Sequence, residues 1–292
     1  MRKLSLKHLL LPALALVPAI AFSMFLPRGG RTEETNRNVR FGMPTPARAD
    51  ILHREDYLIE RTQYVLSYNA RKLTPNWVAW RLHRDDLGKS VRGAFEPDPL
   101  LPVGILRVNT HVFDGSGFDR GHMCPAQDRS SKQEDMDATF YLTNIIPQSP
   151  ASNQHGWERL ESYSRELVKK GQVLYICCGP HGVGGTGKNG LRNDVGRGNL
   201  DVTVPAKIWK VIMVLPSENA VPTKETRTIA IIMPNDQSVG MDWPRYRVSV
   251  RDVEKMTGYT FFRNVPEEVA SVIKNQVDTT EVHVPVSHRP GS

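Results

Sequence analysis

The stretch FDRGHMCPA, residues 118–126, decides how this chain is interpreted. It places His122 between a glycine and a methionine, directly after an Asp-Arg pair. A histidine alone does not establish chemistry, so the polar segments that follow carry the argument. These are TNIIPQ at residues 143–148 and NQHGWERLE at residues 153–161, with Arg165 shortly beyond. This region of the chain therefore concentrates imidazole, amide, carboxylate and guanidinium groups.

The second of these segments lies in a predicted helix. Over Ser152–Lys170 apolar residues recur on one helical stripe, namely Trp157, Leu160, Leu167 and Val168. Counted from Trp157, Asn153 falls at about −40°, Glu161 at about +40° and Arg165 at about +80°. Polar groups at the border of an apolar stripe are typical of a cleft. The alternative is that Asn153 caps the helix and that Glu161 and Arg165 form a surface pair at i,i+4.

The chemistry that fits these groups is hydrolysis of a phosphodiester. A neutral imidazole can activate water, because its ordinary pKa lies near 6.5. Guanidinium groups bind phosphate oxygens bidentately. An amide oxygen together with water suits Mg²⁺, and a nearby carboxylate can orient those waters.

Asp119–His122 resembles the DRGH signature of the DNA/RNA non-specific endonucleases, a family of ββα-metal nucleases. Further similarity covers roughly residues 60–262, including NWVAW at 76–80, VPAKIWK at 204–210 and SVRDVEKMTG at 249–258. The resemblance implies an α+β fold with a central, mainly antiparallel sheet flanked by helices. It also implies an endonuclease that cuts DNA and RNA without sequence preference.

The resemblance further implies a role for each site residue. His122 is similar to the general base that deprotonates the attacking water. Asn153 is similar to the direct protein ligand of Mg²⁺, for which Mn²⁺ would substitute, and Glu161 to the carboxylate that orients water at the metal. Arg120 and Arg165 resemble the residues that stabilise the phosphate and the transition state.

Asn144 resembles the asparagine that supports the network beside the site. The expected products carry 5′-phosphate and 3′-hydroxyl ends, and recognition through the backbone phosphates would leave little sequence preference. Two other functions stay open on the sequence. One is another exported metal-dependent phosphodiesterase or nucleotide hydrolase on the same scaffold. The other is a non-enzymatic nucleic-acid-binding protein.

The rest of the chain predicts a mixed architecture. Apolar runs bounded by turn residues predict strands at 64–68, 77–82, 139–146, 173–178, 207–215 and 228–233. A second helix is expected over residues 249–257, because Ser249 and Asp252 form a capping-box pattern and Gly258 supplies a stop. Strands and helices do not alternate regularly, which favours the α+β class.

The composition of the chain excludes several classes of protein. The chain has 292 residues, 39% hydrophobic and 24% charged, which excludes collagen, coiled coils and multi-span membrane proteins. The net charge is +7, but the first 28 residues hold four of the 38 basic residues and none of the 31 acidic ones. The remaining 34 basic residues against 31 acidic ones are compatible with a nucleic-acid partner without arguing for one.

The N-terminus has the pattern of a secretory signal. Arg2, Lys3 and Lys7 precede an apolar run at residues 9–26, which is also just long enough for a membrane anchor. The expected organisation is a signal peptide or anchor at 1–26, a polar linker at 27–56, a nuclease domain at 57–275 and a loose tail at 276–292. The protein would be secreted, periplasmic or tethered to a membrane, with a mitochondrial location as the alternative. Its oligomeric state stays open.

Overall fold

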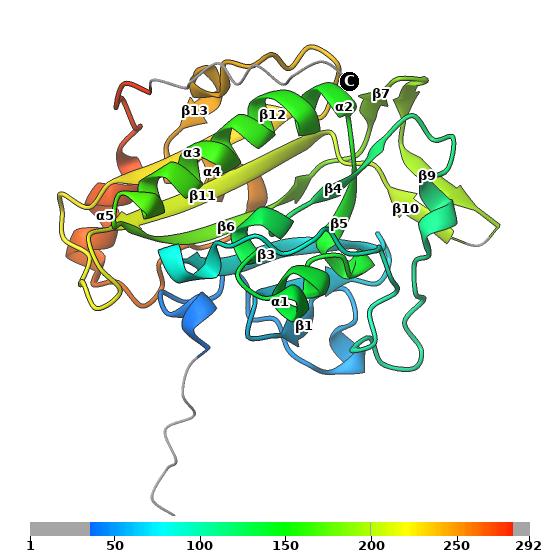
Figure 1. Ribbon diagram of the computed structural model, residues 1–292, viewed down its shortest axis with the longest axis horizontal. Coiled ribbons are helices and arrows are strands. Elements are labelled where there is room, and N and C mark those ends of the chain that lie inside the picture. The colour runs from blue at the N-terminus through cyan, green and yellow to red at the C-terminus, as the bar shows by residue number, and fades with distance from the viewer. Residues whose placement is uncertain (1–35, 199, 283–292) are drawn as a thin grey trace, which may run out of the picture. The chain divides into compact units, whose positions relative to one another are not determined.

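The computed structural model describes residues 36–198 and 200–282. A seven-stranded antiparallel sheet forms its centre (Figure 1). The strands follow the order β1-β2-β3-β6-β11-β12-β13. Their bounds are Tyr57–Glu60 (β1), Val65–Asn69 (β2), Thr74–Leu82 (β3), Val173–His181 (β6), Lys207–Leu215 (β11), Thr228–Pro234 (β12) and Arg247–Val248 (β13). The expected α+β class is confirmed.

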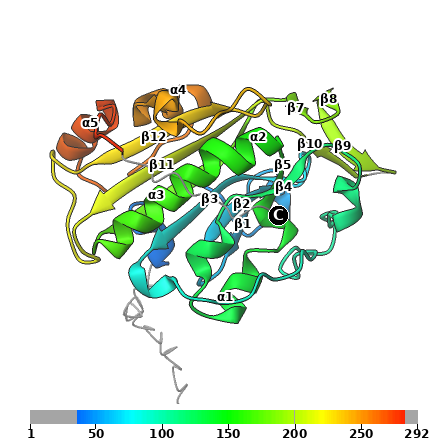
Figure 2. The same ribbon diagram turned by 45° about the horizontal axis from the view of Figure 1, so that its top comes forward.

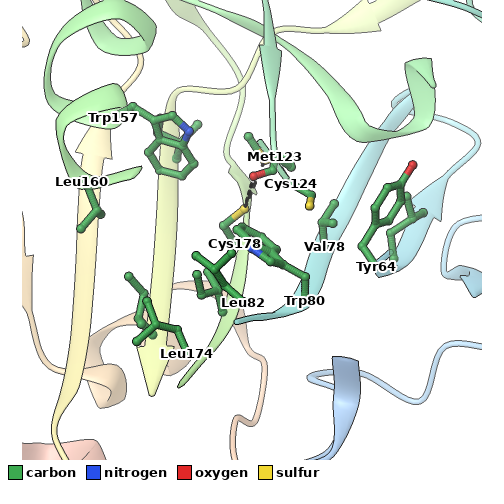
Figure 3. Close-up of a cluster of buried hydrophobic side chains, with 14 of the residues drawn as sticks. Tyr64, Val78, Trp80, Leu82, Met123, Cys124, Trp157, Leu160, Leu174 and Cys178 are labelled. Carbon is green, nitrogen blue, oxygen red and sulfur yellow. Dashed lines mark hydrogen bonds between the residues drawn. The ribbon is translucent and has the colours of Figure 1, made fainter. Parts of the chain in front are cut away.

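Apolar cores cover both faces of this sheet. Along β3, Val78 and Trp80 point into one core and Trp77 and Ala79 into the other, as the strand pleat requires. The first core packs beneath α3 (Glu158–Lys169), where Trp157, Leu160 and Leu174 meet Trp80 (Figure 3). Because both faces are covered, the sequences of the central strands are apolar at almost every position.

The second core lies under the C-terminal helices α4 (Val250–Thr257) and α5 (Glu267–Asn275), which lie beyond β12 in Figure 2. The predicted capping box of α4 is present, since the Ser249 side chain accepts from the Asp252 amide and Asp252 bonds back to the Ser249 amide. Gly258 ends the helix with φ +75°, a left-handed conformation that glycine adopts without strain.

A smaller ββα unit lies on the α3 side of the large sheet. Strand β4 (Asp119–His122) pairs antiparallel with β5 (Ile145–Gln148). The chain then enters α2 (Pro150–Ser152), a π-helical turn at Asn153–Trp157, and α3. The predicted helix over residues 152–170 is confirmed, with a widened turn at its start. π-Turns inside α-helices frequently occur at functional sites.

The remaining described elements are short. Besides short 3₁₀ turns they comprise β7 (Gly185–Gly187) paired with β8 (Gly190–Arg192), β9 (Asp194–Arg197) paired with β10 (Leu200–Thr203), and the helix α1 (Gln133–Ala138). None of the helices in the part of the chain that the structure describes is long and apolar enough to cross a membrane. The predicted signal peptide or anchor at residues 1–26 lies outside the described residues.

The predicted strand at 139–146 is wrong over most of its length. Strand β5 begins only at Ile145, and Leu142–Asn144 form a 3₁₀ turn. The physical reason is Asn144, whose Oδ1 accepts from the Cys124 amide while its Nδ2 donates to the carbonyls of Cys124 and Thr139. These three bonds fold the chain into a turn, which apolar patterning alone does not reveal.

The expected linker at 27–56 and tail at 276–292 also need correction where the structure describes them. From Asn36 onward the chain is folded, and Val39 and Phe41 are buried in the second core. At the other end Val277 bridges to Ser249, and the buried Asp278 accepts hydrogen bonds from Arg227. Few apolar residues anchor these segments, so their polar composition misled the sequence interpretation.

Candidate active site

One cavity of about 700 Å³ gathers most of the predicted site residues. His122 and Arg120 enter it from β4, Asn153 from the π-helical turn and Glu161 from α3. Its size lies within the roughly 300–1,000 Å³ of small-ligand pockets. The cavity therefore joins groups of β4 to groups of the helical segment that follows β5.

His122 presents an unpartnered nitrogen in this region. Its ring packs edge-to-face on Phe140, with centroids 4.8 Å apart, and lies 5.4 Å from the ring of Phe95. The Nε2 atom is buried and has no hydrogen-bond partner. Burial, and to a lesser degree the charge of Arg92, lowers the pKa of His122 to about 3. The imidazole is thus neutral near pH 7.

The glycine of the DRGH stretch is required by close packing. A Cβ atom built on Gly121 would lie 2.1 Å from Oε1 and 2.5 Å from Cβ of Gln148, which is fully buried. Gly121 pairs with Ile146 across the β4–β5 ladder. Only glycine lets β4 approach β5 closely enough to hold His122 at the cavity wall.

Asn153 is oriented by Asp119 rather than serving as a helix cap. Its Nδ2 donates to Asp119 Oδ2 over 2.8 Å, and Gln154 Nε2 donates to the same oxygen over 2.8 Å. No side chain caps the helix start at this turn. With its nitrogen engaged by Asp119, the Asn153 amide has its Oδ1 available to a ligand. The capping alternative for Asn153 is therefore wrong.

Glu161 is largely buried, with 13% of its side chain exposed, and lies 3.7 Å from Nζ of Lys210. Burial raises the pKa of Glu161 to about 7, against the opposing effects of the Lys210 and Arg165 charges. The alternative of a surface pair between Glu161 and Arg165 is also wrong. Arg165 Nη1 instead donates to Asp128 Oδ1 over 3.2 Å.

Arg120 and Arg165 differ in their placement. Arg120 lines the cavity, where its Nη2 donates to Asp114 Oδ1 and to the Thr110 carbonyl, both over 3.0 Å. Arg165 lies one turn beyond Glu161 and outside the set of residues that line the cavity. Asn144 also lies outside this set and is fully buried. Its contacts with Cys124 support the segment directly after His122.

Sequence reasoning missed two basic residues. Arg92 lines the cavity from an irregular loop, with its guanidinium 5.4 Å from the ring centroid of Phe140. No local pattern marks that loop. Lys210 lies within the VPAKIWK segment. A lysine in the middle of an apolar strand is unusual, and this could have marked it as a functional residue. Its partner Glu161 is far away in sequence.

The chain resembles known nucleases along most of its length. Residues 44–268 match the family model described as DNA/RNA non-specific endonuclease. The chain belongs to the DNA/RNA non-specific endonuclease family. A nuclease of Nostoc sp. (strain PCC 7120) is 42% identical over 241 residues, covering 81% of this chain and 84% of that protein. The expected resemblance is confirmed, and this endonuclease is a phosphodiester hydrolase.

Two further relatives agree with the family assignment. Human mitochondrial endonuclease G is 33% identical over 224 residues, covering 74% of this chain and 72% of that protein. A solved structure of the EndoG/EndoGI complex matches with a TM-score of 0.66 at 27% identity, covering 80% of this chain and 93% of that chain. The expected ββα-metal nuclease fold is confirmed.

Within the described ranges 36–198 and 200–282, no group of three or more His, Cys, Asp or Glu side chains could hold a metal ion. The ligand that the sequence predicts for a cation is the Asn153 amide, which lines the cavity. Oxygen donors of this kind suit Mg²⁺, which retains several of its waters in proteins. Asp119 fits this role for Asn153, because it binds the Nδ2 group of the amide and so leaves the Oδ1 atom for an ion.

Proposed function

We propose that this endonuclease hydrolyses phosphodiester bonds of both DNA and RNA, requires Mg²⁺, and uses His122 as its general base. One observation carries the proposal. The buried and unpartnered Nε2 of a neutral His122 belongs to the same cavity wall as the oriented amide of Asn153. A base for water and a ligand for a cation are the two groups that such hydrolysis needs together.

The imidazole takes part through one proton transfer. Nε2 of His122 accepts a proton from water as the water oxygen forms a bond to phosphorus. The bond from phosphorus to the 3′-oxygen breaks, which leaves a 5′-phosphate end and, after protonation of the leaving oxygen, a 3′-hydroxyl end. The packing of the ring on Phe140 limits its rotation and so fixes the direction of Nε2.

The other cavity groups bind and orient. Asn153 would hold the cation through Oδ1, and Glu161 would orient water beside it. Mg²⁺, or Mn²⁺ in its place, supplies positive charge that neutralises the phosphoryl and leaving oxygens. Arg120 and Arg92 line the cavity and would bind the phosphate. Arg165 would stabilise the site from outside the cavity lining, through Asp128 and the charge of Glu161.

Contacts of this kind recognise the nucleic-acid backbone rather than base edges, which supports little sequence preference. We also propose that residues 1–26 direct export or tether the protein to a membrane, ahead of the nuclease domain. The relatives include mitochondrial nucleases, so a mitochondrial location is the competing proposal. Fractionation of cells that express the full chain, with N-terminal sequencing of the product, distinguishes these locations.

Digestion of plasmid DNA and of RNA, with and without EDTA, tests the function directly. Wild type with Mg²⁺ should cut both internally, and EDTA or His122→Ala should abolish most of the cutting. The ends should accept a ligase without prior phosphorylation. Undiminished digestion in EDTA would disprove the role of the metal. Hydrolysis restricted to nucleotides would favour the alternative phosphodiesterase.

A further inference from the structure

A lysine lies inside the apolar core beneath the cavity. Lys210 is at the middle of β11, opposite Cys178 on β6 and Ile231 on β12. Its side chain is 1% exposed. By strand alternation it lies on the same face as Ile208 and Ile212, which belong to the core beneath α3. An apolar residue would fill this position at lower cost, because burying an ammonium group is unfavourable without a charged partner.

The partner of this ammonium group is the carboxylate of Glu161. Nζ of Lys210 lies 3.7 Å from Glu161 Oε1, a separation at which the two groups interact as charges. Nζ also lies 4.0 Å from the ring centroid of Trp157 and 5.6 Å from that of Trp80. Figure 3 shows both rings in this core, Trp157 from the helix side and Trp80 from the sheet. These rings limit the positions that the lysine can occupy.

The other charged groups near Glu161 are engaged elsewhere. Arg165 donates to Asp128 and to the Ser162 hydroxyl. Asp128 also accepts from Trp80 Nε1 over 3.0 Å. Glu158 accepts from the hydroxyl of Ser162 and adds a like charge. Lys210 is therefore the cation that approaches Glu161 from the interior of the protein.

We propose that Lys210 is a positioning residue of this nuclease, which holds the Glu161 carboxylate from beneath so that it faces the cavity. The inference rests on the proposed function, because it assigns Lys210 to the group that orients water beside the cation. Lys210 does not line the cavity, so it is not placed to touch a substrate bound there. It acts through Glu161 alone.

Four variants test this proposal: Lys210→Met, Glu161→Gln, the double variant, and Lys207→Met as the matched control. Lys207 begins the same strand but is exposed. Lys210→Met should lower kcat strongly while leaving KM for DNA unchanged, and the control should match wild type. In the Glu161→Gln background, Lys210→Met should cost no further activity. An equal loss in both backgrounds would overturn the proposal, as would a loss confined to KM.

Two readouts do not depend on turnover. In a His122→Ala background, calorimetric titration with Mg²⁺ should show binding weakened about 10–100-fold by Lys210→Met and unchanged by Lys207→Met. Lys210→Met should lower the thermal midpoint by about 6–20 °C, because it leaves a carboxylate buried alone. The double variant should regain most of this loss, so a folded protein remains for the kinetic comparison.

These outcomes separate the two proposals. The positioning role would be overturned if Lys210→Met left the Mg²⁺ affinity unchanged and the double-mutant cycle of thermal midpoints showed no coupling between Lys210 and Glu161. Wild type would in that case still require Mg²⁺ and His122. Full activity of wild type in EDTA would instead overturn the proposed function. The double-mutant cycle of thermal midpoints would then still show whether Lys210 and Glu161 interact in the core.

Discussion

Replacement of Asp119 tests how Asn153, the proposed metal ligand, is aligned. Asp119 Oδ2 accepts hydrogen bonds from Asn153 and Gln154, each over 2.8 Å. Asp119→Ala removes the acceptor of both bonds at once. The Asn153 amide is then free to rotate about its last side-chain bond and to present its nitrogen, which cannot bind a cation. We expect weaker Mg²⁺ binding with little change in overall stability, because Asp119 and Asn153 are only partly buried.

The size of the loss follows from the orienting role of Asp119. Loss of a partner that orients a metal ligand typically weakens metal affinity about 10–100-fold. That range corresponds to about 1.4–2.7 kcal/mol. Asp119→Asn keeps an oxygen acceptor but loses the charge, so its effect should be smaller, below about tenfold.

The assay is calorimetric titration of Mg²⁺ into His122→Ala protein that also carries Asp119→Ala, Asp119→Asn or Asp201→Ala. Asp201 is an exposed aspartate on β10 and serves as the control. The expected order of affinity is the control first, then Asp119→Asn, then Asp119→Ala. If Asp119→Ala binds Mg²⁺ as tightly as the control, Asp119 does not align the ligand and Asn153 is not the residue whose orientation matters.

Three further predictions concern pH, packing and substrate binding. Because the pKa of folded His122 lies at about 3, below its ordinary value of 6.5, the unfolded chain binds more protons between these values and stability falls as the pH is lowered through this window. Urea unfolding of His122→Gln should show a flatter pH dependence than wild type from pH 6.5 to 4. Gly121→Ala should destabilise the protein by about 1–3 kcal/mol in the same assay, because its Cβ would overlap Gln148; a urea midpoint equal to that of wild type would contradict the packing argument. Arg92→Ala should raise KM for DNA and make binding less sensitive to salt, measured with uncleaved DNA on His122→Ala protein, whereas an unchanged salt dependence would remove Arg92 from the phosphate contacts.

Local sequence signals predicted the parts of the site that local geometry determines. The apolar stripe predicted the helix that carries Asn153 and Glu161, and the Ser249 capping box predicted α4. Gly121 stands in the DRGH stretch because β4 and β5 pack closely, so the motif itself records a contact of the fold. Residues of this kind can be recognised from the neighbouring sequence alone.

Other parts depend on contacts between distant segments. Arg92 reaches the cavity from a loop without periodicity, and Lys210 meets Glu161 only after the sheet and α3 have packed. The turn at Asn144 depends on hydrogen bonds to Cys124, 20 residues earlier. Hydrophobic patterning describes which face of an element is buried and carries no information on these pairings.

The ββα unit explains how residues so far apart in the sequence share one cavity. Antiparallel pairing places Asp119 opposite Gln148, at the end of β5 where the chain turns into the helix, so Asp119 can reach Asn153. From this junction β4 continues three residues to His122, about 10 Å at the usual strand rise. The helix continues eight residues to Glu161, about 12 Å at the helical rise. Strand and helix thus advance by similar distances from one fixed point, which brings the imidazole and the carboxylate to the same cavity as the amide. A one-residue slip of β4 against β5 would turn His122 to the opposite face of the strand and separate these groups.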